Sequence, residues 1–130
     1  MKKMLALVLA LGLMVGLLAG CGGGSGSADE IKIGVNYELS GQVASYGQSS
    51  VNGIMLAIEE INAAGGVNGK KLVPVQVDNK SDAAEAATLA TRLITKDKVV
   101  AILGPATSGA YKSQSPVVQK NKIPSISGSA

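Results

Sequence analysis

The residues of this chain that could take part in chemistry are few, and most of them carry hydroxyls. The 130-residue sequence contains no His and a single Cys, Cys21. This excludes His-dependent catalytic triads, the usual zinc ligand sets and any intrachain disulfide. Three glycine-containing segments, 38–47, 104–108 and 128–130, instead combine one carboxylate, Glu38, with several hydroxyls. The hydroxyl-bearing residues are Ser40, Ser45, Tyr46, Thr107, Ser108 and Ser129.

This set of side chains favours binding over catalysis. Hydroxyls and backbone amides can hold a small polar molecule, whereas no His base and no carboxylate pair is present to transform it. A dinucleotide fingerprint requires glycines that segment 38–47 lacks, and Gly69-Lys70-Lys71 precedes a predicted strand rather than the helix of a phosphate loop. Without those glycines, Asp78 is interpreted as a loop-capping carboxylate rather than a ribose ligand. We therefore expect no enzyme activity, no cofactor and no metal site.

Alternating strand and helix patterns must position these segments. Residues 31–37, 71–77, 99–103 and 123–127 have the short apolar or alternating character of strands. Pro74 indicates that the second of them is an edge strand, because proline cannot donate to the ladder. Residues 48–64, 82–95 and 109–121 are predicted helices between the strands.

The predicted helices have recognisable faces and ends. Gly65-Gly66 ends the first helix. Ser81 is expected to cap the second, and Pro116 is expected to make the third irregular. Their apolar faces comprise Val51, Ile54, Ile58 and Ile61 in the first helix and Ala83, Ala86, Ala90 and Leu93 in the second.

This alternation predicts an α/β fold with a doubly wound parallel sheet. Such sheets bind ligands beyond the carboxyl ends of their strands, at the point where the strand order reverses. The segments 38–47, 104–108 and 128–130 all follow predicted strands. The fold class therefore gathers the hydroxyl-rich segments at one edge of the sheet.

The N-terminal residues have a different character and account for the chain's basic and apolar balance. Lys2 and Lys3 precede the apolar run 4–18, which is too short to span a membrane and typical of a secretory signal. The following Leu-Ala-Gly-Cys21 resembles the lipobox of bacterial lipoproteins. That resemblance implies cleavage of residues 1–20, lipidation of Cys21 and attachment to a membrane through this anchor. Residues 21–28 then comprise the lipidated Cys and a flexible Gly/Ser tether.

Removing residues 1–20 lowers the net positive charge of the chain. The formal charge of the whole chain is +3, with 12 Lys and Arg against 9 Asp and Glu, and two of those lysines lie in the signal. The remaining 110 residues are close to neutral at +1. With little aromatic content and no dense basic cluster, nucleic-acid binding is not expected.

Residues 29–130 resemble a known family. The stretch GVNYELSGQVASYGQSSVNGIMLAIEEINAAGGVNGKKL, residues 34–72, is similar to the first lobe of the leucine/isoleucine/valine-binding proteins, the branched-chain amino-acid binding proteins of ABC importers. Further similarities lie at Asp78, in VAILGPATS at 100–108 and in IPSISGSA at 123–130. The resemblance implies a type I periplasmic binding protein fold that binds a ligand between two lobes.

The resemblance also implies roles for individual residues. Ser108 matches a hydroxyl that holds the ligand's α-carboxylate, and Tyr46 an aromatic that packs over its side chain. Ala106 and Thr107 match pocket neighbours, and Ala130 a backbone position near the ammonium group. From the residues alone, Ser108 as a helix cap and Tyr46 as a loop anchor stay open as alternatives. The predicted ligand-binding set is Tyr46, Ala106, Thr107, Ser108, Ser129 and Ala130.

The function predicted from the resemblance is capture of a branched-chain or similar small amino acid outside the cytoplasm, for delivery to ABC permease subunits. The alternative is a sensor of the same fold for amides, urea or amino acids, and an enzyme on a flavodoxin-like sheet is least favoured. We expect the sequence to be an incomplete first lobe, an N-terminal fragment. We also expect residues 29–130 alone to fold poorly and to bind no amino acid.

Overall fold

The sheet is built from four parallel strands. The computed structural model describes residues 30–130; the predicted signal 1–20, the lipidation at Cys21 and the tether lie outside the described residues. The strands are β1 (Glu30–Tyr37), β2 (Lys71–Asp78), β3 (Ala101–Leu103) and β4 (Ser125–Ile126). They lie in the order β2-β1-β3-β4. The order therefore reverses between β1 and β3, and in the described region β2 is an edge strand, as Pro74 predicted.

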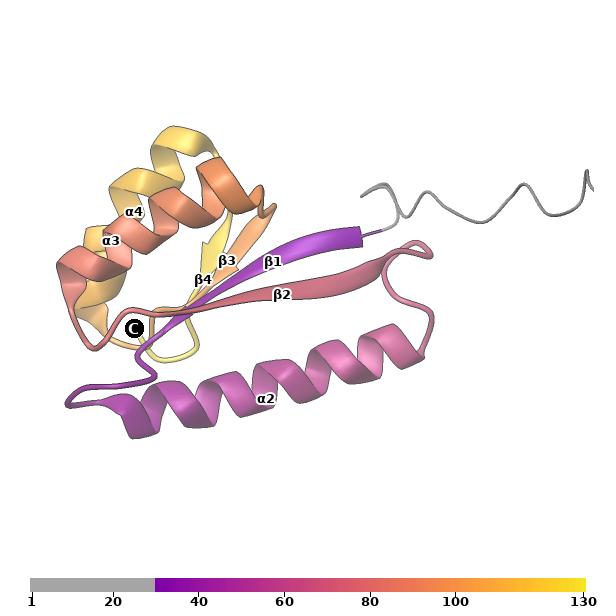
Figure 1. The fold of residues 1–130 in the computed structure, drawn as a ribbon, viewed down its shortest axis with the longest axis horizontal. Helices are drawn as coiled ribbons and strands as arrows, with labels where there is room; N and C mark the ends of the chain where they lie inside the picture. The colour runs from indigo at the N-terminus through magenta and orange to yellow at the C-terminus, as the bar shows by residue number, and fades with distance from the viewer. Residues whose placement is uncertain (1–29) are drawn as a thin grey trace, which may run out of the picture.

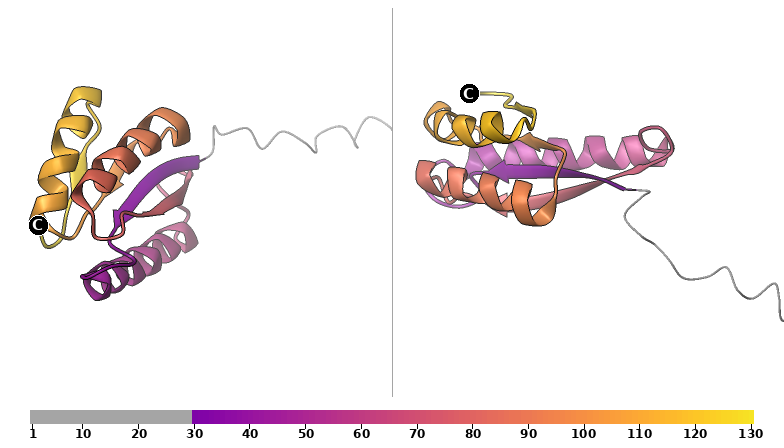
Figure 2. Two further views of the ribbon diagram at one scale, coloured as in Figure 1. Left: turned by 60° about the vertical axis from the view of Figure 1, so that its left-hand side comes forward. Right: turned by 90° about the horizontal axis from the view of Figure 1, so that it is seen from above.

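Helices cover both faces of the sheet, which confirms the doubly wound α/β fold. Helix α2 (Ala44–Ala63) lies on one face (Figure 1). Helix α3 (Ala83–Arg92), its π-helical continuation η2 (Leu93–Asp97) and α4 (Ser108–Asn121) lie on the other (Figure 2). None of the helices in residues 30–130 combines the length and apolar character needed to cross a membrane.

Each face has its own apolar cluster. Leu93 and Ile102 are completely buried between the sheet and the α3–α4 pair, together with Ala90, Val99 and Val118. On the other face, the buried residues Val35, Tyr37, Val51 and Ala106 pack together. The predicted helix faces are largely inside: Val51, Ile58, Ala86, Ala90 and Leu93 are buried, Ile54 and Ala83 are half-buried, and Ile61 is 39% exposed.

Three local predictions were wrong. Helix α2 begins at Ala44 and not at residue 48, so Tyr46 lies in its first turn. Asp82, not Ser81, caps α3, because its carboxylate accepts the Glu85 N–H at 2.7 Å. Helix α4 runs unbroken through Pro116 instead of becoming irregular there. Proline removes one N–H from a helix, and the exposure of Pro116 leaves its ring on the solvent side of α4.

A buried amide chain links the carboxyl ends of the strands to the helices. Asn36 at the end of β1 donates to the Gln114 side chain at 2.8 Å and to the Ala86 carbonyl at 2.9 Å. Gln114 in turn donates to the Gly104 carbonyl at 2.9 Å. Asn36 and Gln114 are both completely buried. Because buried polar groups are costly unless paired, this chain fixes α3 and α4 relative to the ends of β1 and β3.

Candidate functional site

The loop that follows β1 is held by a carboxylate from the end of β2. Asp78 Oδ1 accepts backbone N–H groups from Leu39 at 2.9 Å, Ser40 at 3.1 Å and Lys80 at 2.8 Å. Its Oδ2 accepts the Ser40 hydroxyl at 2.6 Å. This confirms the interpretation of Asp78 as a loop-capping carboxylate.

The same contacts set the ionisation of Asp78. Desolvation acts to raise the pKa of this carboxyl, but the hydrogen bonds from the Ser40 hydroxyl and from the backbone of Lys80, Leu39 and Ser40 outweigh it. The pKa of Asp78 therefore lies below its ordinary value. Asp78 is accordingly ionised near neutral pH, and it is engaged with the loop rather than turned toward a ligand.

The loop between β3 and α4 is held by Glu38, the first residue after β1. Glu38 is completely buried. Its carboxylate accepts the Ala106 N–H at 2.9 Å, the Thr107 N–H at 3.1 Å and the Thr107 hydroxyl at 2.8 Å. Glu38 thus joins two segments nearly 70 residues apart at the point where the strand order reverses. In the sequence it stood out only as the single carboxylate of its segment, and nothing there indicated this partner.

Two glycines allow these loops to approach closely. A methyl group on Gly47, in the first turn of α2, would overlap the Glu38 carbonyl. Gly104 has a φ of 90°, in the left-handed region that favours glycine, and it lies so close to the Asn36 carbonyl that a side chain there would overlap it. These residues bring the start of α2 and the start of α4 together over the end of β1.

A hollow of about 290 Å³ opens where the two loops meet. Its lining includes five of the six residues predicted to bind ligand; the full lining is Val43, Tyr46, Ala106, Thr107, Ser108 and Ser129. Val43, the residue before α2, was missed because the sequence placed it in the middle of a longer loop. Ala130 is not part of the lining; it is exposed, and its N–H donates to the Ser127 hydroxyl at 3.0 Å.

Some hydrogen-bond donors of the hollow already have acceptors within the protein, and others are available to a bound molecule. The N–H groups of Ala106 and Thr107 donate to Glu38, and the Ser129 hydroxyl donates to the Ala106 carbonyl at 2.8 Å. Ser108, by contrast, is the exposed first residue of α4. The first N–H groups of a helix have no intrahelical acceptor and carry its positive dipole end. The hollow therefore presents a hydroxyl and free N–H groups suited to an anion.

The structure argues against the two alternative roles, Ser108 as a helix cap and Tyr46 as a loop anchor. The cap residue of α4 is Thr107, not Ser108, and the Thr107 hydroxyl donates to Glu38 instead of capping the helix. Tyr46 is 67% exposed beside the hollow, which does not fit a buried loop anchor. Both side chains are thus accessible to a bound molecule. Within residues 30–130, no cluster of three or more acidic, His or Cys side chains could hold a metal ion.

Comparisons with known proteins agree with this architecture. A family model described as periplasmic binding protein matches residues 30–130. The chain is 34% identical over 103 residues to the leucine-specific-binding protein of Salmonella typhimurium. That match covers 79% of this chain but only 28% of the relative, so the chain spans little more than a quarter of the relative's length.

Solved structures of substrate-binding proteins from ABC transporters are also similar to this chain. The branched-chain amino acid transporter substrate binding protein of Streptococcus pneumoniae, in complex with isoleucine, superposes with a TM-score of 0.77 and 50% identity over 78% of this chain and 29% of its own. A solute binding protein of an ABC transporter from Rhodopseudomonas palustris, in complex with 3,4-dihydroxybenzoic acid, gives a TM-score of 0.73 and 30% identity, over 78% of this chain and 28% of its own.

Proposed function

Because the chain belongs to the periplasmic binding protein family, we propose that it is the extracytoplasmic solute-binding component of an ABC importer and captures a branched-chain or similar small amino acid. The observation that carries this proposal is the hollow at the strand-order reversal, where Ser108 and the start of α4 offer free donors to an anion. The leucine- and isoleucine-binding relatives support the choice of ligand.

In this proposal the α-carboxylate of the amino acid lies at the start of α4. The Ser108 hydroxyl and the first N–H groups of the helix donate to it, while Tyr46 packs over the ligand's side chain. Ala106, Thr107 and Ser129 form the wall, and Ala130 lies beyond it near the ammonium group. The protein forms and breaks no covalent bond; closure of a second lobe over the ligand, and its release to permease subunits, are the working steps.

Calorimetric titration of a purified chain of the length of the curated relatives tests the proposal. We expect saturable binding of leucine, isoleucine or valine, and a loss of about ten-fold or more in affinity for Ser108→Ala, because a hydrogen bond to a charged group is removed. Ser49→Ala is the matched control, since Ser49 is an exposed hydroxyl on α2 that does not line the hollow. Absence of amino-acid binding, with binding of 3,4-dihydroxybenzoate in its place, would redirect the proposal to aromatic acids.

The proposal also includes the location of the protein. We place it outside the cytoplasm, held to the membrane through a lipid on Cys21. Radiolabelled palmitate should enter the protein in growing cells, and Cys21→Ser should abolish this labelling and release the protein from membranes washed in high salt. Retention of Cys21→Ser on membranes washed in high salt would reject the lipid anchor and leave the amino-acid-binding part of the proposal standing. A sensor role, the alternative, predicts that deletion of the gene leaves leucine uptake unchanged.

A further inference from the structure

We propose that the end of the lobe opposite the ligand hollow is a docking surface for anionic lipid head groups. This end, the basal end, contains the start of β1 and the turn from η2 into β3. Its central residues are Lys32, Lys96, Lys98 and Val100. The inference rests on the lipid anchor included in the proposed function, and it adds how the anchored lobe is oriented on its membrane.

The basal end has a defined hollow of its own. Glu30, Lys32, Lys98 and Val100 line a depression of about 320 Å³. The Val100 N–H donates to the Lys32 carbonyl at 2.9 Å, which fixes the η2–β3 turn against β1. Val100 is 51% exposed although it is apolar. Two lysines beside an exposed apolar side chain suit a lipid surface, because the head groups attract the amines while the valine lies at the interface.

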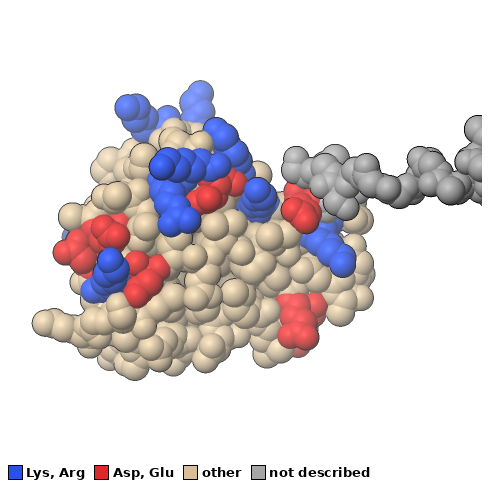
Figure 3. Space-filling view, viewed as in Figure 1, with Lys and Arg blue, Asp and Glu red and all other residues tan. Residues whose placement is uncertain are grey.

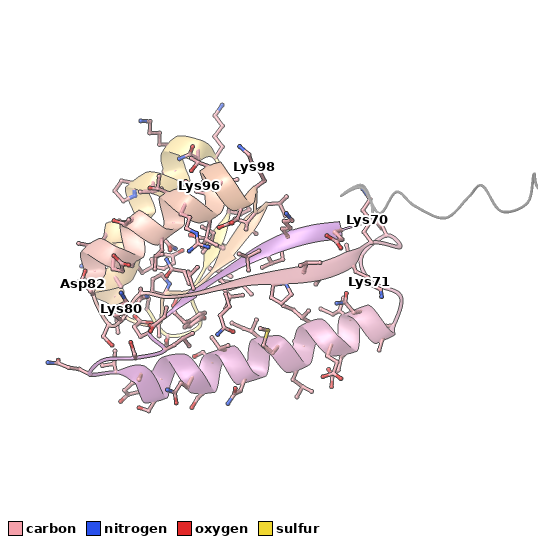
Figure 4. The ribbon with its side chains drawn as sticks, in the orientation of Figure 1. Lys70, Lys71, Lys80, Asp82, Lys96 and Lys98 are labelled. Atoms are coloured by element: carbon pink, nitrogen blue, oxygen red, sulfur yellow. The ribbon has the colours of Figure 1, made fainter. Side chains whose placement is uncertain are left out.

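Charge is unevenly distributed along the strand axis. Figure 3 shows Lys and Arg gathered over the layer of α3 and α4, towards the carboxyl ends of these helices. In Figure 4, Lys96 and Lys98 lie where the α3 layer ends, above the sheet, and Lys70 and Lys71 lie near the start of β1. Lys80 and Asp82 lie on the opposite side of the molecule, at the start of α3. The basal cations are Lys32, Lys70, Lys71, Arg92, Lys96, Lys98, Lys120 and Lys122, and the basal anions are Glu30, Glu59, Glu60 and Asp97.

The ligand end has the reverse balance. It contains the anions Glu38, Asp78, Asp82 and Glu85 against the cations Lys80 and Lys112. At the basal end Asp97 is engaged by Arg92 at 3.4 Å, so these two charges offset each other and Lys96 and Lys98 keep theirs. A negatively charged bilayer therefore attracts the basal end and repels the ligand end.

The sequence between the anchor and the lobe allows this contact. Cys21 precedes Glu30, the first residue of β1, by nine residues. Fully extended, these span at most about 30 Å, and as a Gly/Ser coil they have a mean reach of about 17 Å. Since β1 begins at the basal end, the chain enters the lobe beside the basal lysines, and an anchor at Cys21 within this reach favours contact between the basal end and the membrane. The ligand hollow lies about one strand length further away, roughly 25 Å.

Vesicle co-sedimentation tests the docking surface. A chain of the length of the curated relatives is produced from residue 21 onward with Cys21→Ser, so that no lipid contributes. It is mixed with vesicles of phosphatidylcholine alone or with 40% phosphatidylglycerol. We expect binding only to the anionic vesicles and its loss in high salt. Lys96→Gln with Lys98→Gln should weaken it about 25-fold, because each lysine near the surface contributes about five-fold.

A matched pair provides the control. Lys80→Gln with Lys112→Gln removes the same charge from the ligand end, and Lys80 and Lys98 share a left-handed backbone conformation. We expect this pair to change vesicle binding less than two-fold. Equal losses for the two pairs, or no binding to anionic vesicles at all, would overturn the proposal. Leucine titration of the same samples keeps the outcomes separate, because a failed docking surface leaves leucine binding intact.

Discussion

At the scale of single residues, the site depends on how Glu38 is used. Its carboxylate lies next to the place proposed for the ligand's carboxylate, yet it does not compete with it. Three donors from Ala106 and Thr107 satisfy the Glu38 oxygens, and the side chain is fully buried. Glu38 thus fixes the loop whose next residue, Ser108, faces the hollow. We interpret Glu38 as a positioning residue.

Glu38→Gln tests this role. The amide keeps the size of the side chain but turns one acceptor oxygen into a donor that faces other donors. In a chain of the length of the curated relatives, we expect the free energy of unfolding to fall by about 2 kcal/mol and leucine affinity to fall at least ten-fold, measured by denaturant titration and calorimetry. Glu60→Gln, at an exposed carboxylate on α2, should change neither quantity appreciably. Unchanged leucine affinity in a destabilised Glu38→Gln protein would show a structural role only.

At the scale of elements, the approach of α2 to β1 depends on Gly47. Because a methyl group there would overlap the Glu38 carbonyl, Gly47→Ala must displace α2 or the end of β1. We expect the free energy of unfolding to decrease by about 1–3 kcal/mol. Gly53→Ala, in the same helix with no atom near its added methyl group, should increase it by up to about 1 kcal/mol. Denaturant titration of both variants, each made in a chain of the length of the curated relatives, measures the difference. A stabilising Gly47→Ala would contradict the packing described above.

The elements also show what the sequence could and could not predict. Apolar runs and periodic apolar faces predicted the four strands and three α-helices of residues 30–130, although not the π-helical segment η2. They also placed the hydroxyl-rich segments at one edge, because burial of a repeating face is a local property. Helix ends were less predictable. Glycine is typical of loops, but Gly47 lies inside α2, where its lack of a side chain lets the helix pack against the Glu38 carbonyl. Likewise, the capping of α3 by Asp82 frees Ser81 to donate to the Ser40 carbonyl at 2.7 Å. Such long-range partners leave no periodic signal in the sequence.

At the scale of the whole molecule, the two faces of the sheet are covered unequally. Within residues 30–130, helices α3 and α4 together cover one face, whereas α2 is the single helix on the other. Beside α2 an apolar hollow of about 280 Å³ is left open, and Ile126 on β4 is 65% exposed. The hollow is lined by Ile33, Ile54, Ala57, Ile58, Ile61, Leu72, Ala101 and Leu103. Apolar surface that stays exposed contributes no burial free energy, and a small α/β unit needs that free energy to offset the loss of chain entropy on folding.

We therefore expect residues 29–130, produced alone, to unfold without a cooperative transition and to bind no leucine. Differential scanning calorimetry should show a broad, shallow profile that leucine does not shift, and a dye sensitive to exposed apolar surface should bind before heating. A chain of the length of the curated relatives, measured in parallel, should melt sharply and rise in melting temperature with leucine, because a ligand stabilises only the folded state that binds it. A sharp melt of residues 29–130 would contradict this expectation, because it would mean that α2 buries enough of its face of the sheet to give a stable fold. A shift of that melt by leucine would mean that the hollow lined by Tyr46 and Ser108 binds ligand without a second lobe.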